Sequence, residues 1–373
     1  MPPSASVLAA IAVRQRLALL AGITACVAVG LCLAVTGNAR EPRPHTPAGI
    51  TALAPAGGIA VSLRSHRVIT LVLPKLDPQQ TALRAQDFTL QSSADPAYTR
   101  PLPATRLGFD RQVTGFIDDR TAITETRLHL LLPHALRDGL DYRLQAPAAG
   151  LAELPVSWRT QQLTGSIQLN QVGYLPAAHK RAYIGNWLGS AGAMPVDSED
   201  FQVLDADSGE AVLTGKLQLR AASDPWSGND VYTADFSALH KPGHYRLRVP
   251  GLGQSDSFHI GADVYAAVYR TTGRYFYHHR NGTAIQAPWA APGHERPGGI
   301  PARFDGVFHE DVADSPLGNK EPAGGYHAVT GGWFDAGDYG QYLPNAAPVW
   351  YVIGAALDIA AQQFRDGDLD IPE

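Results

Sequence analysis

The chain has 373 residues, of which 45% are hydrophobic and 17% are charged, and its formal net charge is −5. This length exceeds that of one ordinary domain, so two or three domains with apolar cores are expected. A mildly acidic chain without an arginine-rich run excludes nucleic acid as the main partner. Both cysteines, Cys26 and Cys32, lie in the N-terminal apolar stretch, which excludes disulfides and cysteine-based zinc sites from the rest of the chain.

An export signal is the first expected element. Residues 17–36 carry no charge, follow Arg14 and Arg16, and precede a small-x-small pattern at residues 37–39. These three parts are typical of a secretory signal peptide, and a run of about 20 apolar residues is also long enough to cross a bilayer. We therefore expect residues 1–39 to be a signal peptide or an uncleaved membrane anchor. Either one would export the following residues to the periplasm or beyond the cell, and membrane contact is expected only through this segment.

A Pro-rich linker over residues 40–49 leads into a block with strand-like patterns. In residues 50–160, short β-branched and apolar runs such as residues 67–75 and 126–134 are separated by turn residues. This spacing predicts a β-rich domain and suggests a sandwich of immunoglobulin type, although the Cys…Trp…Cys signature is absent.

A second strand-rich block covers residues 166–260. Near its end Tyr245, Leu247 and Val249 alternate with polar side chains, which is typical of a strand with one buried face. Residues 257–260 are expected to form the closing strand. The block predicts a second immunoglobulin-like sandwich.

After Gly261 the pattern becomes helical. Asp263 is a candidate N-cap for a helix that ends near Gly282. The Gly/Pro-rich stretch that follows is long for a loop, so we expect it to be functional. A second helix is predicted over residues 348–364, with Pro348 in its first turn. Its buried stripe is expected to contain the following residues: Val349, Ile353, Leu357, Ala360 and Phe364.

Candidate catalytic residues lie in residues 331–342, which read GGWFDAGDYGQY. Asp335 and Asp338 are separated by small residues, so both carboxylates can point the same way from one tight turn. Trp333 and Tyr339 offer ring faces for the C–H faces of sugars. A close like-charge pair raises the pKa of one carboxyl, which suits a general base. The spacing alone also fits a calcium loop or a turn with solvated acids.

The longer string around these acids resembles a known signature. Residues 330–342 are similar to the TGGWYDAGDYGKY motif of glycoside hydrolase family 9, with Phe334 in place of tyrosine and Gln341 in place of lysine. LNQVGYLP at residues 169–176 and the sequence of residues 232–251 resemble the immunoglobulin-like module that precedes the catalytic domain of this family. The resemblance covers about residues 166–373 and excludes the 50–160 block.

This resemblance implies a multidomain fold: immunoglobulin-like β-sandwich modules followed, over residues 263–373, by the start of an all-α (α/α)6 barrel. It implies inverting hydrolysis of β-1,4-glucans such as cellulose or cellodextrins. Asp338 would be the base that activates water, Asp335 would help to hold this water, and Trp333 and Tyr339 would contact the polysaccharide or oligosaccharide.

The resemblance also bears on completeness and on metals. The family's general acid is a glutamate late in the barrel, so we expect this chain to be an incomplete and inactive piece of the enzyme. We expect no cofactor in these residues and a calcium-binding stretch just after the position of Glu373.

Some family members bind a structural zinc through cysteines near the first catalytic helix. Asn281 and Gly293 stand at two of these positions, so we expect the zinc site to be absent. We then expect three histidines to be ordinary side chains rather than ligands: His278, His279 and His294.

A hypothesis of another class is a non-catalytic carbohydrate-binding or structural protein made of two sandwiches with a vestigial helical tail. The retention of Asp335 and Asp338 within their aromatic frame favours the enzyme.

Overall fold

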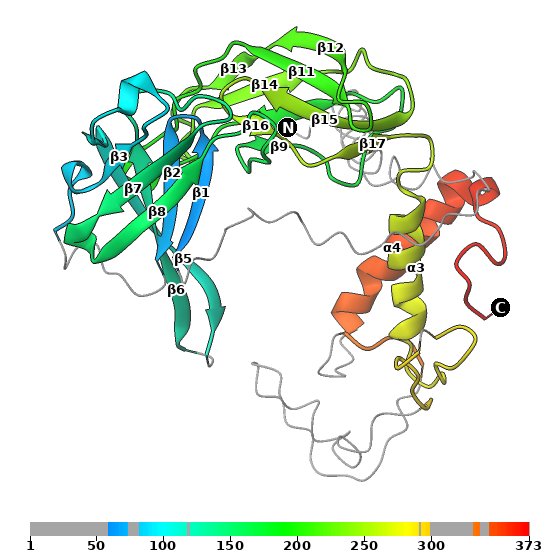
Figure 1. Ribbon diagram of the computed structural model, residues 1–373. Helices are drawn as coiled ribbons and strands as arrows, with labels where there is room; N and C mark the ends of the chain where they lie inside the picture. Colours follow the sequence, from blue (N-terminus) through cyan, green and yellow to red (C-terminus); the bar gives the residue numbers. More distant parts are fainter. Residues whose placement is uncertain are drawn as a thin grey trace, which may run out of the picture. The chain divides into compact units, whose positions relative to one another are not determined.

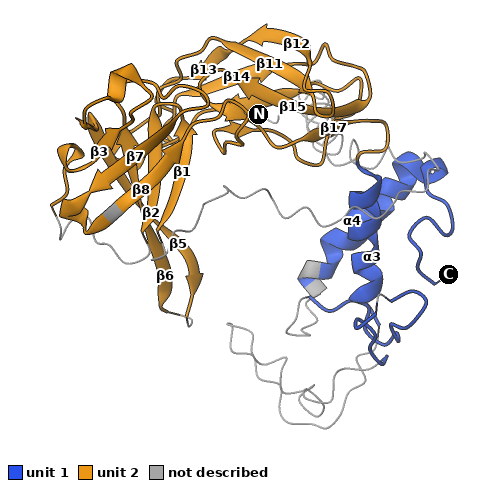
Figure 2. Ribbon diagram, viewed as in Figure 1, with its two compact units in different colours: residues 1–42, 265–373 blue, residues 43–264 orange. Residues whose placement is uncertain are grey.

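The computed structural model describes residues 59–73, 82–117, 120–290, 292–298, 331–335 and 343–372. The described residues divide into two compact units: those up to residue 264 form one, and those from residue 265 onward form the other (Figure 2). The expected export signal at residues 17–36 lies outside the described residues. Among the residues that the structure describes, no helix is long and apolar enough to cross a membrane.

The first part of the larger unit is a β-sandwich of two four-stranded antiparallel sheets (Figure 1). One sheet has the order β1-β2-β6-β5, with β1 at Ala60–Ser65, β2 at Val68–Leu73, β6 at Ala122–Leu131 and β5 at Arg106–Phe116. The other has the order β4-β3-β7-β8, with β4 at Leu102–Pro103, β3 at Thr89–Gln91, β7 at Asp141–Ala146 and β8 at Leu151–Ser157. Short 3-10 helices lie at Ala85–Asp87 (η1), Pro96–Tyr98 (η2) and Pro147–Ala149 (η3).

Strand alternation builds the core of this first sandwich. Ile69 and Leu71 of β2 and Leu128 and Leu130 of β6 are fully buried between the two sheets, as the period of two residues in a strand requires. Trp158, which follows the last strand of this domain, is also buried in this core. The strands expected in residues 67–75 and 126–134 are therefore confirmed.

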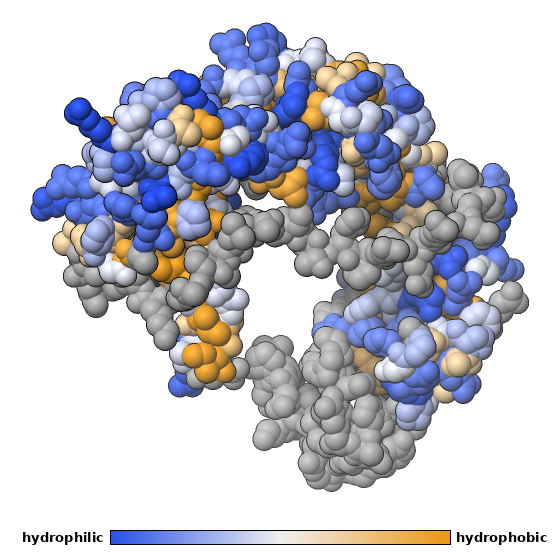
Figure 3. All heavy atoms as spheres, viewed as in Figure 1, coloured by the Kyte–Doolittle hydropathy of each residue, from blue (hydrophilic) through white to orange (hydrophobic). Residues whose placement is uncertain are grey.

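The hairpin of β5 and β6 carries apolar side chains at its end, where Figure 3 shows them on the surface. The two strands stay paired as far as Phe116 and Ala122. The exposed apolar residues of this tip are Val113, Phe116, Ile117 and Ile123.

A second β-sandwich follows. Its smaller sheet has the order β13-β14-β10-β9, with β13 at Gln218–Ala221, β14 at Val231–Asp235, β10 at Arg181–Ile184 and β9 at Ile167–Gln168. Its larger sheet has the order β12-β11-β15-β16, and β17 also pairs with β15. These strands are β12 at Ala211–Lys216, β11 at Asp200–Asp205, β15 at Gly243–Val249, β16 at Gly253–Gln254 and β17 at Phe258–Ile260. One 3-10 helix, η4, covers Gly189–Ala191.

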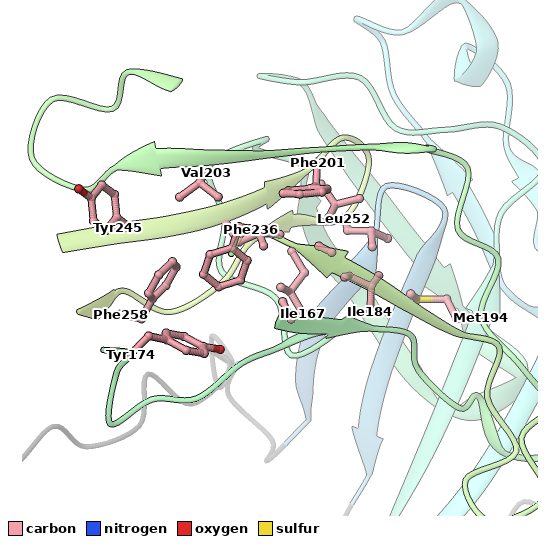
Figure 4. Close-up of a cluster of buried hydrophobic side chains, with 14 of the residues drawn as sticks. Ile167, Tyr174, Ile184, Met194, Phe201, Val203, Phe236, Tyr245, Leu252 and Phe258 are labelled. Carbon is pink, nitrogen blue, oxygen red and sulfur yellow. The ribbon is translucent and has the colours of Figure 1, made fainter. Parts of the chain in front are cut away.

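Aromatic and aliphatic side chains from both sheets fill the core of the second sandwich (Figure 4). Tyr174, Phe236 and Phe258 meet in this core, with ring centroids 5.2 to 5.7 Å apart. On β15, Tyr245, Leu247 and Val249 are buried, which confirms the predicted one-sided strand. The closing strand at residues 258–260 is also confirmed.

The two sandwiches of the larger unit are packed against each other. Val68 of β2 belongs to the core of the second sandwich, and the carbonyl of Arg64 accepts hydrogen bonds from the hydroxyls of Thr164 (3.2 Å) and Ser166 (3.1 Å). Gly189 leaves no room for a side chain, because a methyl carbon there would collide with the carbonyl of Phe109. The interface is therefore built by close backbone approach as well as by buried polar contacts.

The smaller unit begins with helix α3 at Ala266–His278. The expectation that Asp263 caps this helix is wrong, since a turn covers residues 262–265 and Tyr265 holds the N-cap position without a side-chain cap. The side chain of Val264 lies close to Gly173 of the second sandwich, so the chain stays with that sandwich through residue 264 and the helix starts after it.

The second helix, α4, covers Leu343–Ala360 and is followed by the 3-10 helix η7 at Ala361–Gln363. Its start is five residues earlier than predicted, and Pro348 lies inside the helix rather than in its first turn. The predicted stripe is not fully buried, because Leu357 is 48% exposed. The helix also exposes Trp350, Tyr351, Val352 and Ile359, so a large part of its apolar surface has no cover among the described residues.

Candidate functional site

Two glycines open the segment that carries the candidate acids. Gly331 and Gly332 have φ values of 107° and 65°, which residues with a Cβ adopt rarely, so the chain can turn sharply here. The N–H of Asn281 donates to the carbonyl of Gly332 (3.1 Å), and the N–H of Phe334 donates to the carbonyl of His279 (2.9 Å). These bonds fix the turn to the C-terminal end of α3.

Trp333 is half-buried and is held by two helices. Its Nε1–H donates to the carbonyl of Phe276 at 2.7 Å, and its ring lies edge-on to that of Phe276 with centroids 5.9 Å apart. The ring of Trp350 on α4 lies 4.9 Å away, centroid to centroid. An aromatic ring that is already fixed loses little conformational entropy when a ligand binds. This pair of tryptophans therefore forms a firm apolar surface beside the acidic turn.

Arg296 anchors the buried ring of Phe334. Its guanidinium carbon lies 5.2 Å from the centroid of the Phe334 ring, within the range of a cation–π contact. The same guanidinium donates to the carbonyls of His278 (2.9 Å) and Arg280 (2.5 Å). One side chain thus ties the turn and the end of α3 together.

Asp335 is exposed and directly follows this anchored segment. The hydroxyl of Tyr275 on α3 donates to the main-chain carbonyl of Asp335 at 3.4 Å. The structure therefore brings Asp335 and Trp333, two of the residues expected from the sequence, together at the end of α3. Asp338 and Tyr339 lie outside the described residues.

His278 and His279 end α3 next to the turn. The ring of His279 stacks on that of Tyr275, with centroids 4.0 Å apart. Burial lowers the pKa of both imidazoles, and the charges of Arg274 beside His278 and of Arg296 beside His279 lower it further. Both rings are therefore neutral near pH 7. In the described part of the chain, no group of three or more His, Cys, Asp or Glu residues could hold a metal ion.

Trp350 and Arg296 also contact this turn and were not predicted from the sequence. Trp350 lies within the predicted second helix but outside its expected apolar stripe, and α4 carries apolar residues on nearly all sides, so the sequence pattern does not single out this ring. Arg296 follows a Gly/Pro-rich segment with no periodic pattern, and nothing in the sequence distinguishes it from a solvated arginine.

The described residues thus form two β-sandwiches followed by helices, with an acidic turn beside tryptophan rings. Residues 162–254 match the family model described as cellulase N-terminal ig-like domain, and residues 265–369 match the one described as glycosyl hydrolase family 9. The chain therefore belongs to the glycosyl hydrolase family 9 proteins that carry an N-terminal Ig-like domain, and it contains part of the catalytic domain.

Curated relatives are similar to this chain over part of their length. The chain is 33% identical over 208 residues to a xyloglucan-specific endo-beta-1,4-glucanase of Bacteroides ovatus. This aligned region covers 56% of this chain and 32% of that protein. The chain is 33% identical over 205 residues to a cellodextrinase of Butyrivibrio fibrisolvens, covering 55% and 32%. It is 30% identical over 236 residues to endoglucanase D of Acetivibrio thermocellus, covering 60% and 33%. The chain thus spans about a third of the length of these relatives.

Solved structures of this family are also similar. A metagenome-derived family 9 endoglucanase matches with 34% identity and a TM-score of 0.45, covering 56% of this chain and 36% of that one. A family 9 protein of Bacteroides ovatus matches with 30% identity and a TM-score of 0.43, covering 56% and 35%.

Proposed function

We propose that the whole protein hydrolyses β-1,4-glucans with inversion, using Asp338 as the base that activates water and Asp335 to hold that water. The observation that carries this proposal is the GGWFD segment at residues 331–335, whose main chain is hydrogen-bonded to the end of α3 within residues that match glycosyl hydrolase family 9. The named relatives act on β-1,4-linked glucans or cellodextrins, which supports this substrate class. No observation on the described residues favours the non-catalytic alternative.

The chemistry requires two carboxyl groups with different tasks. The base takes a proton from water while the water oxygen attacks the anomeric carbon on the face opposite the leaving group. A carboxylic acid protonates the glycosidic oxygen as that bond breaks, and in inverting enzymes the two carboxyl groups lie about 6.5–9.5 Å apart. We assign the acid to a glutamate in the part of the catalytic domain that this chain does not span.

The remaining expectations form part of the same proposal. We infer that α3 and α4 are the first helices of an (α/α)6 barrel, in which later helices cover the apolar side chains that α4 exposes. Trp333 and Tyr339 would stack on sugar rings next to the acids. Residues 1–39 would export the protein, and a fusion of residues 1–45 to a reporter that is active only outside the cytoplasm would then give a signal.

The test uses a chain extended through the complete catalytic domain, with cellohexaose as the substrate. Asp338→Asn should lower kcat by about 10²–10⁴-fold, the usual worth of general base catalysis, because an amide cannot accept the proton. KM should change little, since the stacking groups remain. Asp335→Asn should lower kcat by a smaller factor, because other groups can also position the water.

Stereochemistry gives a second readout. NMR of fresh product should show the α-anomer first, because water enters opposite the β-linked leaving group. A β-anomer, or near-normal turnover by Asp338→Asn, would overturn the assignment and favour a calcium loop or a solvated turn.

A further inference from the structure

Trp226 is the most exposed large apolar side chain of the described residues, with 95% of its surface accessible. It lies in the turn between β13 and β14 of the Ig-like domain, far in sequence from the acidic turn. A fully exposed tryptophan leaves a large apolar surface in water, and it has no packing role that would explain its presence. It therefore points to a ligand or partner.

The turn that presents Trp226 is rigid. The Asp224 carboxylate accepts hydrogen bonds from the N–H (2.8 Å) and the hydroxyl (2.7 Å) of Ser227. The N–H of Gly228 donates to the carbonyl of Asp224 (2.8 Å), and the N–H of Ser223 donates to the carboxylate of Asp230 (2.8 Å). A backbone fixed in this way displays the ring with little entropy left to lose on binding.

A second tryptophan lies against the same turn. Gly228 is so close to Trp187 that a methyl carbon at residue 228 would lie 2.9 Å from the indole ring. Trp187 itself is 44% exposed. Four residues earlier, on the outer face of β10, Tyr183 is also exposed, and the guanidinium carbon of Arg220 lies 5.8 Å from its ring centroid. We name these three residues, Trp187, Trp226 and Tyr183, the aromatic platform.

The surroundings of the platform favour an uncharged polyhydroxylated ligand. The residues next to Trp226 are small or polar, so the ring is not part of the continuous apolar area that a protein partner buries. The carboxylates of Asp224 and Asp230 accept hydrogen bonds from Ser227 and Ser223 of the same turn, so both acids hold the loop that presents the ring. Ring faces beside polar groups match a sugar chain, whose rings offer C–H faces and hydroxyls.

The platform lies at the end of the Ig-like domain opposite the one where the chain leaves it. β10 and β14 are antiparallel, with Ile184 opposite Tyr232 and Arg181 opposite Asp235. The loop with Trp226 therefore lies beyond the Ile184 end. Tyr174, which pairs with Ile260, donates its hydroxyl to the carbonyl of Arg181 at the other end.

We propose that the aromatic platform of the Ig-like domain is a non-catalytic binding site for a β-1,4-glucan chain, with Trp226 and Trp187 stacking on its sugar rings. The choice of glucan rests on the proposed function, whereas the existence of a sugar-binding platform rests on the Ig-like domain alone. Its role would be to keep the protein on a polymer whose other segments reach the acids.

Affinity electrophoresis of the purified chain in gels with and without hydroxyethyl cellulose tests the proposal. The unaltered chain should be retarded by the polymer, and Trp226→Ala and Trp187→Ala should each weaken the retardation roughly tenfold, the loss expected for a central aromatic contact. Trp226→Tyr should keep most of it, since a ring face remains. Val212→Ala, at an exposed apolar position on β12, is the matched control and should behave like the unaltered chain.

Two outcomes would overturn the proposal. One is equal retardation of all variants, which would place any glucan binding elsewhere, for example at Trp333. The other is a concentration-dependent molecular mass that Trp226→Ala abolishes while retardation is unchanged, which would make the platform a contact between copies of this chain. Because the assay measures binding and not hydrolysis, an extended enzyme without glucanase activity would refute the proposed function and leave this result intact.

Discussion

The two compact units differ in how their apolar side chains are used. In the larger unit, the side chains of both sandwiches point into closed cores in which Leu247 and Leu128 are fully buried. In the smaller unit the buried cluster contains Tyr277, Ile285 and Ala290, while α4 leaves most of its large apolar residues exposed. A sheet can bury its face against a partner sheet of the same domain, whereas two helices enclose little volume. The sandwiches therefore hold their shape from their own residues, whereas α4 leaves apolar surface that no other described residue covers.

Matched leucine truncations in the two units test this difference directly. Leu247→Ala should lower the free energy of unfolding of the sandwich unit by about 2–5 kcal/mol, because it removes buried surface and leaves a cavity. Leu357→Ala should change stability by about 0.5 kcal/mol or less, since its side chain is already half-exposed. Urea denaturation followed by circular dichroism measures both. A large effect at Leu357 would show that α4 is covered, and the contrast between the units would be lost.

The packing between the two sandwiches can be tested at Gly189. Its φ of 60° is left-handed, and an added methyl group would collide with the carbonyl of Phe109. Gly189→Ala should therefore cost more than the roughly 1–2 kcal/mol of the backbone strain alone. Gly150→Ala is the control, because Gly150 is also left-handed and nothing lies within 4 Å of the added carbon. Equal losses of stability in the two variants would mean that the interface is loose.

A smaller effect is expected from a buried histidine at the same interface. His129 accepts or donates hydrogen bonds at both nitrogens, to Thr70 Oγ1 (2.9 Å) and to Asp110 Oδ1 (2.8 Å). Burial lowers the pKa of its imidazole, although Asp110 opposes this. Below about pH 6.5 the unfolded chain therefore binds a proton that the folded chain resists, and stability falls as the pH is lowered, by at most about 1.4 kcal/mol per pH unit.

Denaturation of the unaltered chain and of His129→Gln across pH 5 to 8 measures this contribution as a difference in slope. The exposed His179→Gln serves as the control. Identical slopes for the unaltered chain and His129→Gln would exclude His129 as a source of the pH dependence.

Local patterns predicted much of the sandwiches, because a strand shows its buried face directly in the sequence. Tyr245, Leu247 and Val249 were assigned correctly on this ground alone. Contacts between segments that are distant in the sequence produce no such local pattern. Lys180 is fully buried and its ammonium donates to the carbonyls of Pro176 (2.7 Å) and Ala178 (2.8 Å), although lysine is expected at the surface.

The residues of the candidate site also fall into two groups, those that the sequence predicts and those that only the fold brings together. Trp333 and Asp335 could be found because they belong to a continuous motif. Trp350 and Arg296 could not, since they reach the turn through the fold and not through sequence spacing. The helix start at Asp263 was misplaced because Val264 contacts Gly173, an interaction that a capping rule does not contain.

The close fit at Gly189 also has a practical consequence for anyone who shortens this protein. A recombinant chain that begins at residue 162, where the family match starts, would lose Val68 from the core of the Ig-like domain and would uncover the turn that packs on β5. Low solubility of such a chain would then reflect the surface exposed by the truncation and not a property of the Ig-like domain itself. A boundary near residue 59 keeps this surface covered, and it is the better starting point for producing the Ig-like domain with its platform.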